Sequence, residues 1–428
     1  MRKNHKVAKK DQKNSSLNAL TPPSQWELPG MTVMSLLQHG SALLLKQAIA
    51  EEISVYLGRG HYEHSLTSSE NKGYRNGYQR TLIDTPIGQL IYDRPKLTGA
   101  TDFKSQYHSP HVRRPEEFAA SICDMYVNGV STRKVKDSLK AVAGEKVRLS
   151  KSTISRITKK LREEFRNWQK RDLSQLKVAY LFLDAIRVGM RMGGTNKDAV
   201  LIAYAILQDG TLEVLSIDLS QSETLRSWGK FINDLKARGL MDPLLVCSDG
   251  NSGVISAIDS NFPQSYRQRC VKHKSENILD AIAEQDKNVI SEKLSQIFYG
   301  ATSLEQAKLF VKKFVKEFSK KYPTAISRFQ TDLDQCLTFY LFPSNHWRRI
   351  RTSNKLERLN KEIRRRLKVI GRHPDENGCL SLIYHVTTKY AQRQLGFKTD
   401  DLTHALWKKL REEKIAMIQQ LELDLYVS

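Results

Sequence analysis

The order of strand and helix patterns between residues 177 and 273 restricts the fold more than any other feature of this sequence. Three strand-like apolar runs follow one another across short turns, and helical and strand patterns then alternate. The predicted order is β-β-β-α-β-α-β. Hairpin-linked strands followed by alternating helices and strands predict a mixed sheet within an α/β domain.

This element order is the RNase H-like one, in which the first and fourth strands are neighbours. Each of these strands carries one acidic residue: Asp184 interrupts the apolar run YLFLDAI, and Asp249 ends LLVCSDG. A carboxylate in a core strand is costly unless it binds a cation or a donor, although Asp249 also fits an ordinary Asp-Gly turn. Two neighbouring carboxylates would form a site for Mg²⁺, a hard cation that takes oxygen ligands.

A third oxygen ligand is expected from a later helix, and the best candidate is Glu357 in RTSNKLERLNKEIRRRLKVIGRHP. Glu362 competes with it but lies about 140° away around the helix, so the two cannot both face one site. An ion pair between Glu357 and Lys361 is the structural alternative. Asp184, Asp249 and Glu357 together would hold two Mg²⁺ ions, for which Mn²⁺ can substitute. The ions would activate water or a DNA 3′-hydroxyl and stabilise the leaving oxygen.

The charge balance indicates a polyanionic partner. Lys and Arg number 69 against 46 Asp and Glu, a formal net charge of +23 at pH 7. From this charge we expect double-stranded DNA as the partner. No apolar run is long enough to span a membrane, so we expect no membrane association. The residues expected to contact DNA are Arg133, Lys134, Lys151, Arg156, Arg348, Arg349, Arg358, Arg364, Arg365 and Arg366.

Two short helical patterns with a polar turn precede the α/β region, and the second opens with SKSTISR. This layout is typical of a helix-turn-helix, and a helical bundle with a solvated basic face is the alternative. Ser131 and either Ser150 or Ser152 occupy positions expected of helix N-caps. The predicted domains are a basic flexible arm (1–30), an N-terminal helix with a small β-element (31–110), a helix-turn-helix DNA-binding domain (111–173), a catalytic domain (174–273 and 346–396), an α-helical insertion (274–345) and a C-terminal helix (397–428).

Cysteine usage bears on the compartment and on metal binding. The five cysteines are widely spaced, which argues against a disulfide scaffold, and the N-terminus lacks a secretory apolar segment. We therefore expect a cytoplasmic, nucleoid-associated protein. Cys270 and His273 have the C-x₂-H spacing of half a zinc site, but no second half follows. The alternative is that the pair ends the last strand, SYRQRCVKH, and organises the groove by hydrogen bonding.

Several segments occur in a distinctive order: RNGYQRTLIDTPIGQL, MYVNGVSTRKV, STISRI, LDAIRV, VCSDGNSGVISAIDSNFPQSYRQRCVKH and HWRRIRTSNKLERLNKEIRRRLKVIGRHP. Together they span about residues 33–395, and the chain resembles the Mutator-type DDE transposases of bacterial insertion sequences. The resemblance implies an RNase H-like domain with an all-α insertion between the second Asp and the Glu. It places the catalytic roles on Asp184, Asp249 and Glu357, and the family's C-x₂-H and tryptophan on Cys270, His273 and Trp347.

The resemblance further implies an enzyme that binds terminal inverted repeats and catalyses Mg²⁺-dependent strand cleavage and transfer into target DNA. A homodimer or higher assembly on DNA is expected. The family's H-K-x-R-N segment carries Glu276 here in place of its arginine. This departure keeps open a catalytically inert DNA-binding regulator of the element. An RNase H-like nuclease without strand transfer is the third hypothesis.

Overall fold

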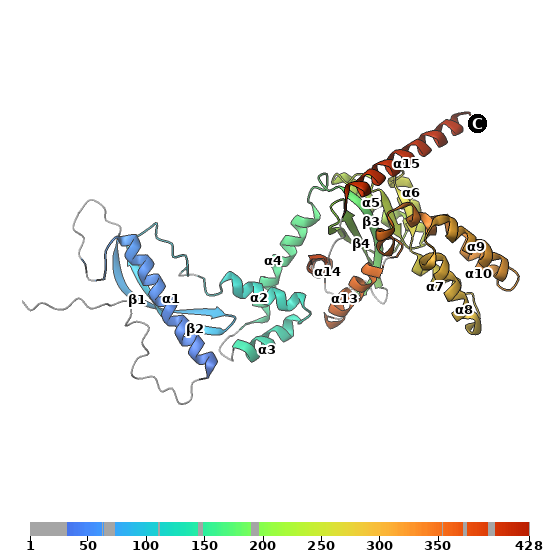
Figure 1. Cartoon of the computed structure of the whole chain (residues 1–428). Coiled ribbons are helices and arrows are strands. Elements are labelled where there is room, and N and C mark those ends of the chain that lie inside the picture. The colour runs from blue at the N-terminus through green and yellow to red at the C-terminus, as the bar shows by residue number, and fades with distance from the viewer. Residues whose placement is uncertain are drawn as a thin grey trace, which may run out of the picture. The chain divides into compact units, whose positions relative to one another are not determined.

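The computed structural model describes residues 32–61, 63, 73–109, 112–143, 149–189, 197–352, 354–370, 375–392 and 399–427 (Figure 1). The arm predicted for residues 1–30 lies outside these ranges. The chain divides into two compact units. The first unit comprises Met1–Ser121 and Lys136–Leu149, and the second comprises Ile122–Val135 and Ser150–Ser428.

In the first unit a long helix covers a two-stranded hairpin. Helix α1 (Val33–Leu57) begins at the N-cap Thr32 and ends at Gly58, whose φ of 63° is readily available only to glycine. Strands β1 (Tyr74–Thr85) and β2 (Gly88–Thr98) pair antiparallel across a tight turn. Apolar side chains of α1 and the hairpin form one buried cluster. The predicted helix and small β-element are thus both present.

Three helices follow: α2 (Glu116–Val127), α3 (Thr132–Ala143) and α4 (Lys151–Gln169). Helix α4 begins where the sequence predicts, because the Ser150 side chain accepts a 3.1 Å hydrogen bond from the Thr153 N–H. Leu161 and Phe165 of α4 are buried in the main core of the second unit. The helical content predicted for this part of the chain is therefore confirmed, but the first of the two predicted helices is divided into α2 and α3.

The second unit is built around a mixed five-stranded sheet in the order β5-β4-β3-β6-β7. The β5-β4-β3 ladders are antiparallel and the β3-β6-β7 ladders are parallel. The element order matches the predicted β-β-β-α-β-α-β. The elements are β3 (Val178–Gly189), β4 (Lys197–Leu207), β5 (Leu212–Ser220), α5 (Leu225–Ala237), β6 (Leu245–Ser248), α6 (Ser252–Asn261) and β7 (Tyr266–Arg269).

The two faces of the sheet pack against different helices. Leu181 and Leu183 of β3 lie in a core with buried residues of α5 and α6. Tyr180, Phe182 and Ile186 point to the opposite face and join the core formed with the later helices. Asp184 is two residues from both Phe182 and Ile186, so it lies on the same face of the sheet, which the C-terminal helices cover.

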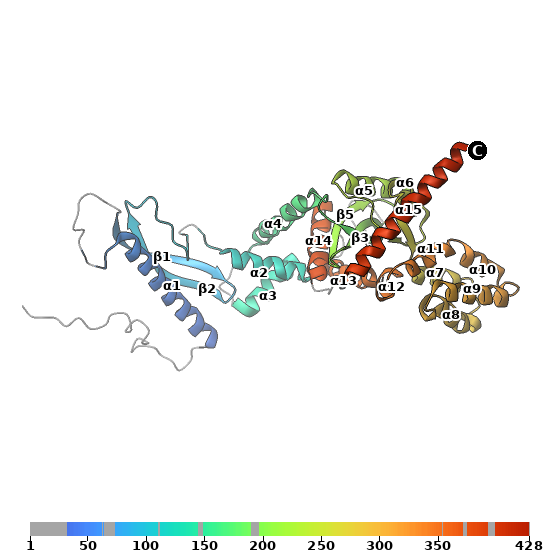
Figure 2. The ribbon, with the colours of Figure 1, turned by 45° about the horizontal axis from the view of Figure 1, so that its top comes forward.

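A helical segment separates the last strand from the C-terminal helices, as predicted (Figure 2). One prediction at its start was wrong: the run SYRQRCVKH is a strand only to Arg269, and helix begins at Val271. Val271 donates its N–H to the Arg351 carbonyl, a partner that turns the chain away from the sheet. The elements are α7 (Val271–Leu279), η1 (Glu284–Asp286), α8 (Lys287–Ser295), η2 (Gln296–Gly300), α9 (Leu304–Phe318), α10 (Pro323–Gln330), α11 (Leu333–Leu337), η3 (Thr338–Leu341) and α12 (Ser344–Ile350).

The chain then returns to the sheet through α13 (Asn354–Ile370) and α14 (Glu376–Gln392) and ends in α15 (Asp401–Val427). A buried polar relay joins α15 to the sheet. Trp407 Nε1 donates to the Tyr180 hydroxyl at 2.9 Å, and that hydroxyl lies 2.8 Å from His346 Nδ1. Among the residues described, no helix has the length and apolar character needed to cross a bilayer.

Candidate active site

Asp184 lies in β3, and Asp249 follows directly after the neighbouring parallel strand β6. The last paired residues of β3 and β6 are Phe182 and Cys247, and each Asp lies two residues beyond its strand's member of that pair. The two carboxylates therefore lie beside each other where the β3–β6 pairing ends. Burial raises the pKa of Asp184 to about 6, and the negative charge of Asp249 adds to the effect. The two carboxylates therefore interact electrostatically.

Hydrogen bonds fix the orientation of both Asp side chains. Asp184 Oδ1 accepts from the Ala185 N–H at 2.8 Å, and Oδ2 accepts from Asn360 Nδ2 of α13 at 2.7 Å. Asp249 Oδ1 accepts from the Asn251 N–H at 3.0 Å, and Asn251 in turn caps α6. The first carboxylate is thus tied to a helix from the end of the chain, and the second to the loop that opens α6.

Helix α13 brings Glu357 to the same region. Leu359, Ile363 and Leu367 recur every fourth residue and are buried, so they anchor this helix on the core. Glu357 lies one turn before Asn360, the donor to Asp184, and these two residues share a helix face. The Glu357 Oε2 atom accepts a hydrogen bond from the Lys272 ammonium, which is therefore its ion-pair partner.

Glu362 is engaged elsewhere. Its carboxylate accepts 2.9 Å hydrogen bonds from both Arg365 and Arg366 on its own helix. The guanidinium groups lower the pKa of Glu362, chiefly through the hydrogen bond from Arg365. Glu362 is thus a partner of the basic helix surface, whereas Glu357 faces the region of Asp184.

The chemistry of this region fits a hard divalent cation. It offers oxygen donors, and Glu357 Oε1 and Asn360 Oδ1 are buried with no hydrogen-bond partner among the described residues. As the side chains stand, no three His, Cys, Asp or Glu residues of the described ranges are gathered closely enough to hold a metal ion. The Lys272 ammonium occupies one oxygen of Glu357.

Cys270, His273 and Trp347 make different contacts, and the charges of Asp184 and Asp249 act on His273. Cys270 is buried at the N-cap of α7, and His273 lies in the first turn of that helix. A hydrogen bond with Cys270, opposed by burial and assisted by the negative charge of Asp184 and Asp249, raises the pKa of His273 to about 9. Trp347 Nε1 donates to the Phe342 carbonyl at 2.7 Å, which anchors α12.

The predicted DNA-contact residues lie on α3, α4, α12 and α13, and their exposure differs. The side chains of Arg133 and Lys151 lie outside the described residues. Arg349 and Arg366 are partly buried, and the other six are exposed: Lys134, Arg156, Arg348, Arg358, Arg364 and Arg365. DNA contact by these residues stays a prediction.

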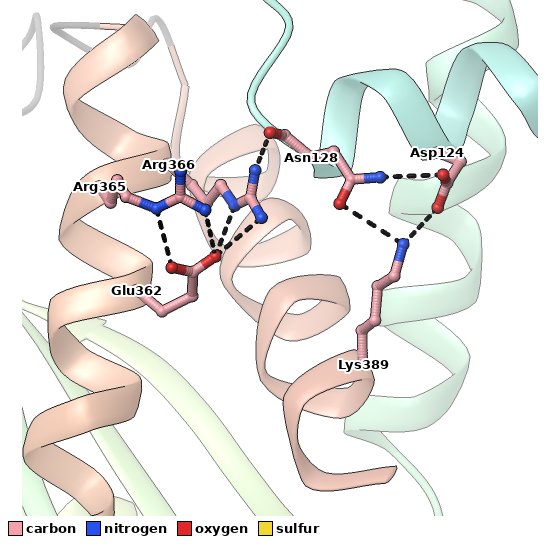
Figure 3. A network of polar contacts seen from close by, with 6 residues as sticks. All are labelled: Asp124, Asn128, Glu362, Arg365, Arg366 and Lys389. Carbon is pink, nitrogen blue, oxygen red and sulfur yellow. Dashed lines mark hydrogen bonds and ion pairs between the residues drawn. The ribbon is translucent and has the colours of Figure 1, made fainter. Parts of the chain in front are cut away.

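Figure 3 shows that Arg366 belongs to a polar network joining α13 and α14 to the end of α2. Arg366 donates to the Asn128 backbone carbonyl, and Lys389 of α14 lies 2.5 Å from Asp124 Oδ1. Arg365 lies at the edge of the network with its side chain 65% exposed, against 16% for Arg366. The two neighbouring arginines therefore have different surroundings.

A cavity of about 460 Å³ lies beside this network. Cationic side chains dominate its wall, and Glu362 contributes the one carboxylate among the lining residues. Arg358, Arg365, Arg366 and Lys389 provide the positive charge. Such a cavity suits an anionic group such as a backbone phosphate.

Asn360 and Lys272 belong to the site but were not among the site residues predicted from the sequence. Asn360 had a detectable signal, because it lies three residues after Glu357 and so shares its helix face. Lys272 had none, because its segment was predicted as a strand and its partner lies 85 residues later. Both residues act on predicted carboxylates.

Comparison with known proteins identifies the family. Residues 27–394 match the family described as "Transposase, Mutator family". The chain is 34% identical to the transposase for insertion sequence element ISRM5 of Rhizobium meliloti (strain 1021), over 79% of this chain and 84% of the relative. It is 32% identical to the transposase for insertion sequence element IS406 of Burkholderia multivorans, over 80% of this chain and 87% of the relative.

Among solved structures, the chain is similar to the Drosophila P element transposase strand transfer complex, with 11% identity and a TM-score of 0.29. That alignment covers 73% of this chain and 93% of the other, and its score is too low to assign a fold. The family match and the alignments with the two relatives are comparisons of sequence, and they span most of the chain. The chain therefore belongs to the Mutator family of transposases.

Proposed function

We propose that this protein is the DNA transposase of an insertion sequence and that Asp184, Asp249 and Glu357 are its catalytic residues. The observation that carries the proposal is the position of two carboxylates just beyond the last residue pair of β3 and β6, with α13 bonded to one of them. The family membership supports the reaction class. The substrate would be double-stranded DNA bearing the terminal inverted repeats of the element, together with a target duplex.

The fold is proposed to be RNase H-like. Three antiparallel strands followed by two parallel strands, in the order β5-β4-β3-β6-β7, support this assignment. The helical segment between β7 and α13 would be the insertion that separates the second Asp from the Glu. The helix-turn-helix would lie within residues 111–173, and the basic surface of α13 would contact phosphates.

Each protein group has a defined task in this proposal. Asp184, Asp249 and Glu357 would hold two Mg²⁺ ions, which would supply Lewis acidity for activating water or a 3′-hydroxyl and for stabilising the leaving oxygen. Asn360 orients Asp184 through its 2.7 Å hydrogen bond. Desolvation raises the pKa of Asp184 to about 6, which favours its neutralisation by a cation or a proton. The arginines of α13 would hold the DNA backbone across the site.

Cleavage of element-end DNA tests the proposal. The full-length protein is incubated with labelled DNA carrying the element ends, with Mg²⁺ or with EDTA, and Asp249→Asn is run in parallel. The expected result is nicking at the end that requires Mg²⁺ and is lost in the variant, while a mobility-shift assay shows DNA binding by both proteins. Binding by both proteins without cleavage by either would contradict the proposal.

The same reaction separates the two alternatives. Glu276 in place of the family's arginine favours an inert regulator, and that reading predicts binding without cleavage. A nuclease without strand transfer would cut the ends but would give no joined products from DNA with pre-cut 3′ ends. Joined products from such DNA support the transposase.

A further inference from the structure

Lys272 lies between two carboxylates of unequal exposure. Its ammonium donates to Glu357 Oε2, and it also lies 3.7 Å from Glu276 Oε1, one turn along α7. The Glu357 side chain is 17% exposed and that of Glu276 is 55% exposed. The inner carboxylate belongs to the proposed metal site, and the outer one is the residue by which this chain departs from its family.

The start of α7 fixes Lys272 in this position. Val271 donates its N–H to the Arg351 carbonyl at 3.0 Å, three residues before α13 begins. The two helices that carry Lys272 and Glu357 are thereby joined near their first turns. The ion pair is therefore set by the backbone, and the flexible Lys272 side chain is the part that can move.

A divalent cation at Glu357 would conflict with this arrangement. Two positive groups on one carboxylate lie within a few ångströms of each other and repel strongly in a partly buried site. Lys272 already has a second acceptor in Glu276, which is reachable by side-chain rotation alone. The route away from Glu357 is thus built into α7.

We propose that Lys272 is a positioning residue that occupies Glu357 in the metal-free protein and passes to Glu276 when a divalent cation binds. The proposal rests on the metal site proposed above. It assigns Glu276 a function, namely to accept the displaced ammonium. Without a cation, the Lys272 ammonium neutralises part of the negative charge of the carboxylates. When the cation binds, it replaces the ammonium at Glu357.

Two substitutions have opposite expected effects on the affinity for Mn²⁺, measured by electron paramagnetic resonance on the full-length protein without DNA. Lys272→Met removes the competing charge and keeps the length of the side chain. It should tighten Mn²⁺ binding by about tenfold, the equivalent of one charge-assisted hydrogen bond. Glu276→Gln removes the second acceptor and should weaken binding by about two- to fivefold, since exposed pairs are weak.

The double variant Lys272→Met/Glu276→Gln distinguishes movement of the Lys272 ammonium to Glu276 from a general effect of the two charges on Mn²⁺ affinity. If Glu276 acts through Lys272, then Glu276→Gln should have no effect in the Lys272→Met background. Additive effects of the two substitutions would overturn the proposal, as would unchanged or weaker Mn²⁺ binding by Lys272→Met. Lys293→Met is the matched control, because it removes a 3.0 Å ion pair with Glu317 away from the site and should leave Mn²⁺ affinity unchanged.

Two further measurements keep the outcomes distinct. The metal-free Lys272→Met protein should unfold at a lower temperature than wild type, whereas Lys272→Arg, which keeps the charge, should retain wild-type Mn²⁺ affinity. If Asp249→Asn leaves Mn²⁺ binding unchanged, the proposed metal site is wrong. If Asp249→Asn weakens binding but Lys272→Met does not alter it, the site stands and the exchange is wrong.

Discussion

The Asn360 amide donates a 2.7 Å hydrogen bond to Asp184 Oδ2, and this contact joins α13 to the central strand of the sheet. It links residues 176 positions apart in the sequence. Because Glu357 is one turn away on the same helix, the bond also sets how closely the third carboxylate approaches the first two. Its removal provides a direct test of the site's geometry.

Asn360→Ala should lower the free energy of unfolding by about 1–3 kcal/mol, because the partly buried Asp184 carboxylate loses a donor. Cleavage of element-end DNA should fall by about 10- to 100-fold, since the carboxylates lose their relative placement. Urea unfolding and a cleavage assay check both effects. Asn261→Ala is the control, because the Asn261 side chain donates within its own helix, at 2.8 Å to the Ala257 carbonyl. Equal cleavage by the two variants would refute the positioning role.

Arg365 and Arg366 are adjacent but should respond differently to alanine substitution. Arg366→Ala should cost about 1–3 kcal/mol of stability, because it leaves Glu362 and the Asn128 carbonyl short of a donor. Arg365→Ala should change stability by less than about 0.5 kcal/mol, because the residue is exposed. It should instead weaken DNA binding and reduce the slope of log affinity against log salt concentration by about one, the effect of losing one phosphate contact. Chemical denaturation and DNA titrations at several salt concentrations provide the readouts, and an unchanged salt slope for Arg365→Ala would contradict its phosphate contact.

His346 should make the fold acid-sensitive. Burial lowers its pKa to about 4, and the nearby positive charge of Arg349 contributes. The unfolded chain therefore binds more protons between pH 4 and the ordinary histidine value near 6.5. The stability from neutral His346 is full above about pH 6.5 and is lost as pH falls towards 4, by up to about 3 kcal/mol.

A comparison with His346→Gln isolates this contribution, because glutamine does not titrate. The difference in unfolding free energy between wild type and the variant should shrink from pH 7.5 to pH 4.5. Urea denaturation followed by tryptophan fluorescence measures it, since Trp407 lies in the same relay. Parallel pH profiles for the two proteins would show that His346 does not titrate in this range.

Gly253, in the first turn of α6, lies against the backbone at the start of α5. A Cβ atom at this position would lie 2.8 Å from the Leu225 backbone nitrogen, which cannot move without shifting the helix. Gly253→Ala should therefore destabilise the protein by about 1–3 kcal/mol. At Gly229, within α5, an added Cβ meets nothing within 4 Å. Gly229→Ala should be stabilising by up to about 1 kcal/mol, and thermal unfolding of both variants tests the contrast.

The sheet could be predicted because its signals are local. Apolar runs bounded by turn residues define the strands, and hairpin turns define the antiparallel half. Asp184 stood out because it interrupts the apolar run of β3 at a position with no local use for a carboxylate. The segment after Arg269 was mispredicted because Cys270 and Val271 continue an apolar pattern that suits a strand. Its helix is favoured instead by the tertiary contact with Arg351.

The contacts around the site could be predicted only in part. Asn360 follows from Glu357 by helical spacing, once that helix is assigned. The Lys272–Glu357 pair depends on how the segment between β7 and α13 folds back on itself, and no periodic signal records that path. Glu276 was noticed only as a departure from the family, and its neighbour Lys272 gives the departure a structural context.

The separation in sequence between Asp184 and its donor also determines when the site can form during translation. Chains emerge from the ribosome N-terminus first, so the strands that carry both Asp residues are translated well before α13. A nascent chain that has completed the sheet still lacks Asn360 and Glu357. The protein therefore cannot assemble its three carboxylates until most of its length has been translated, and a prematurely terminated product would retain basic surface without the full site.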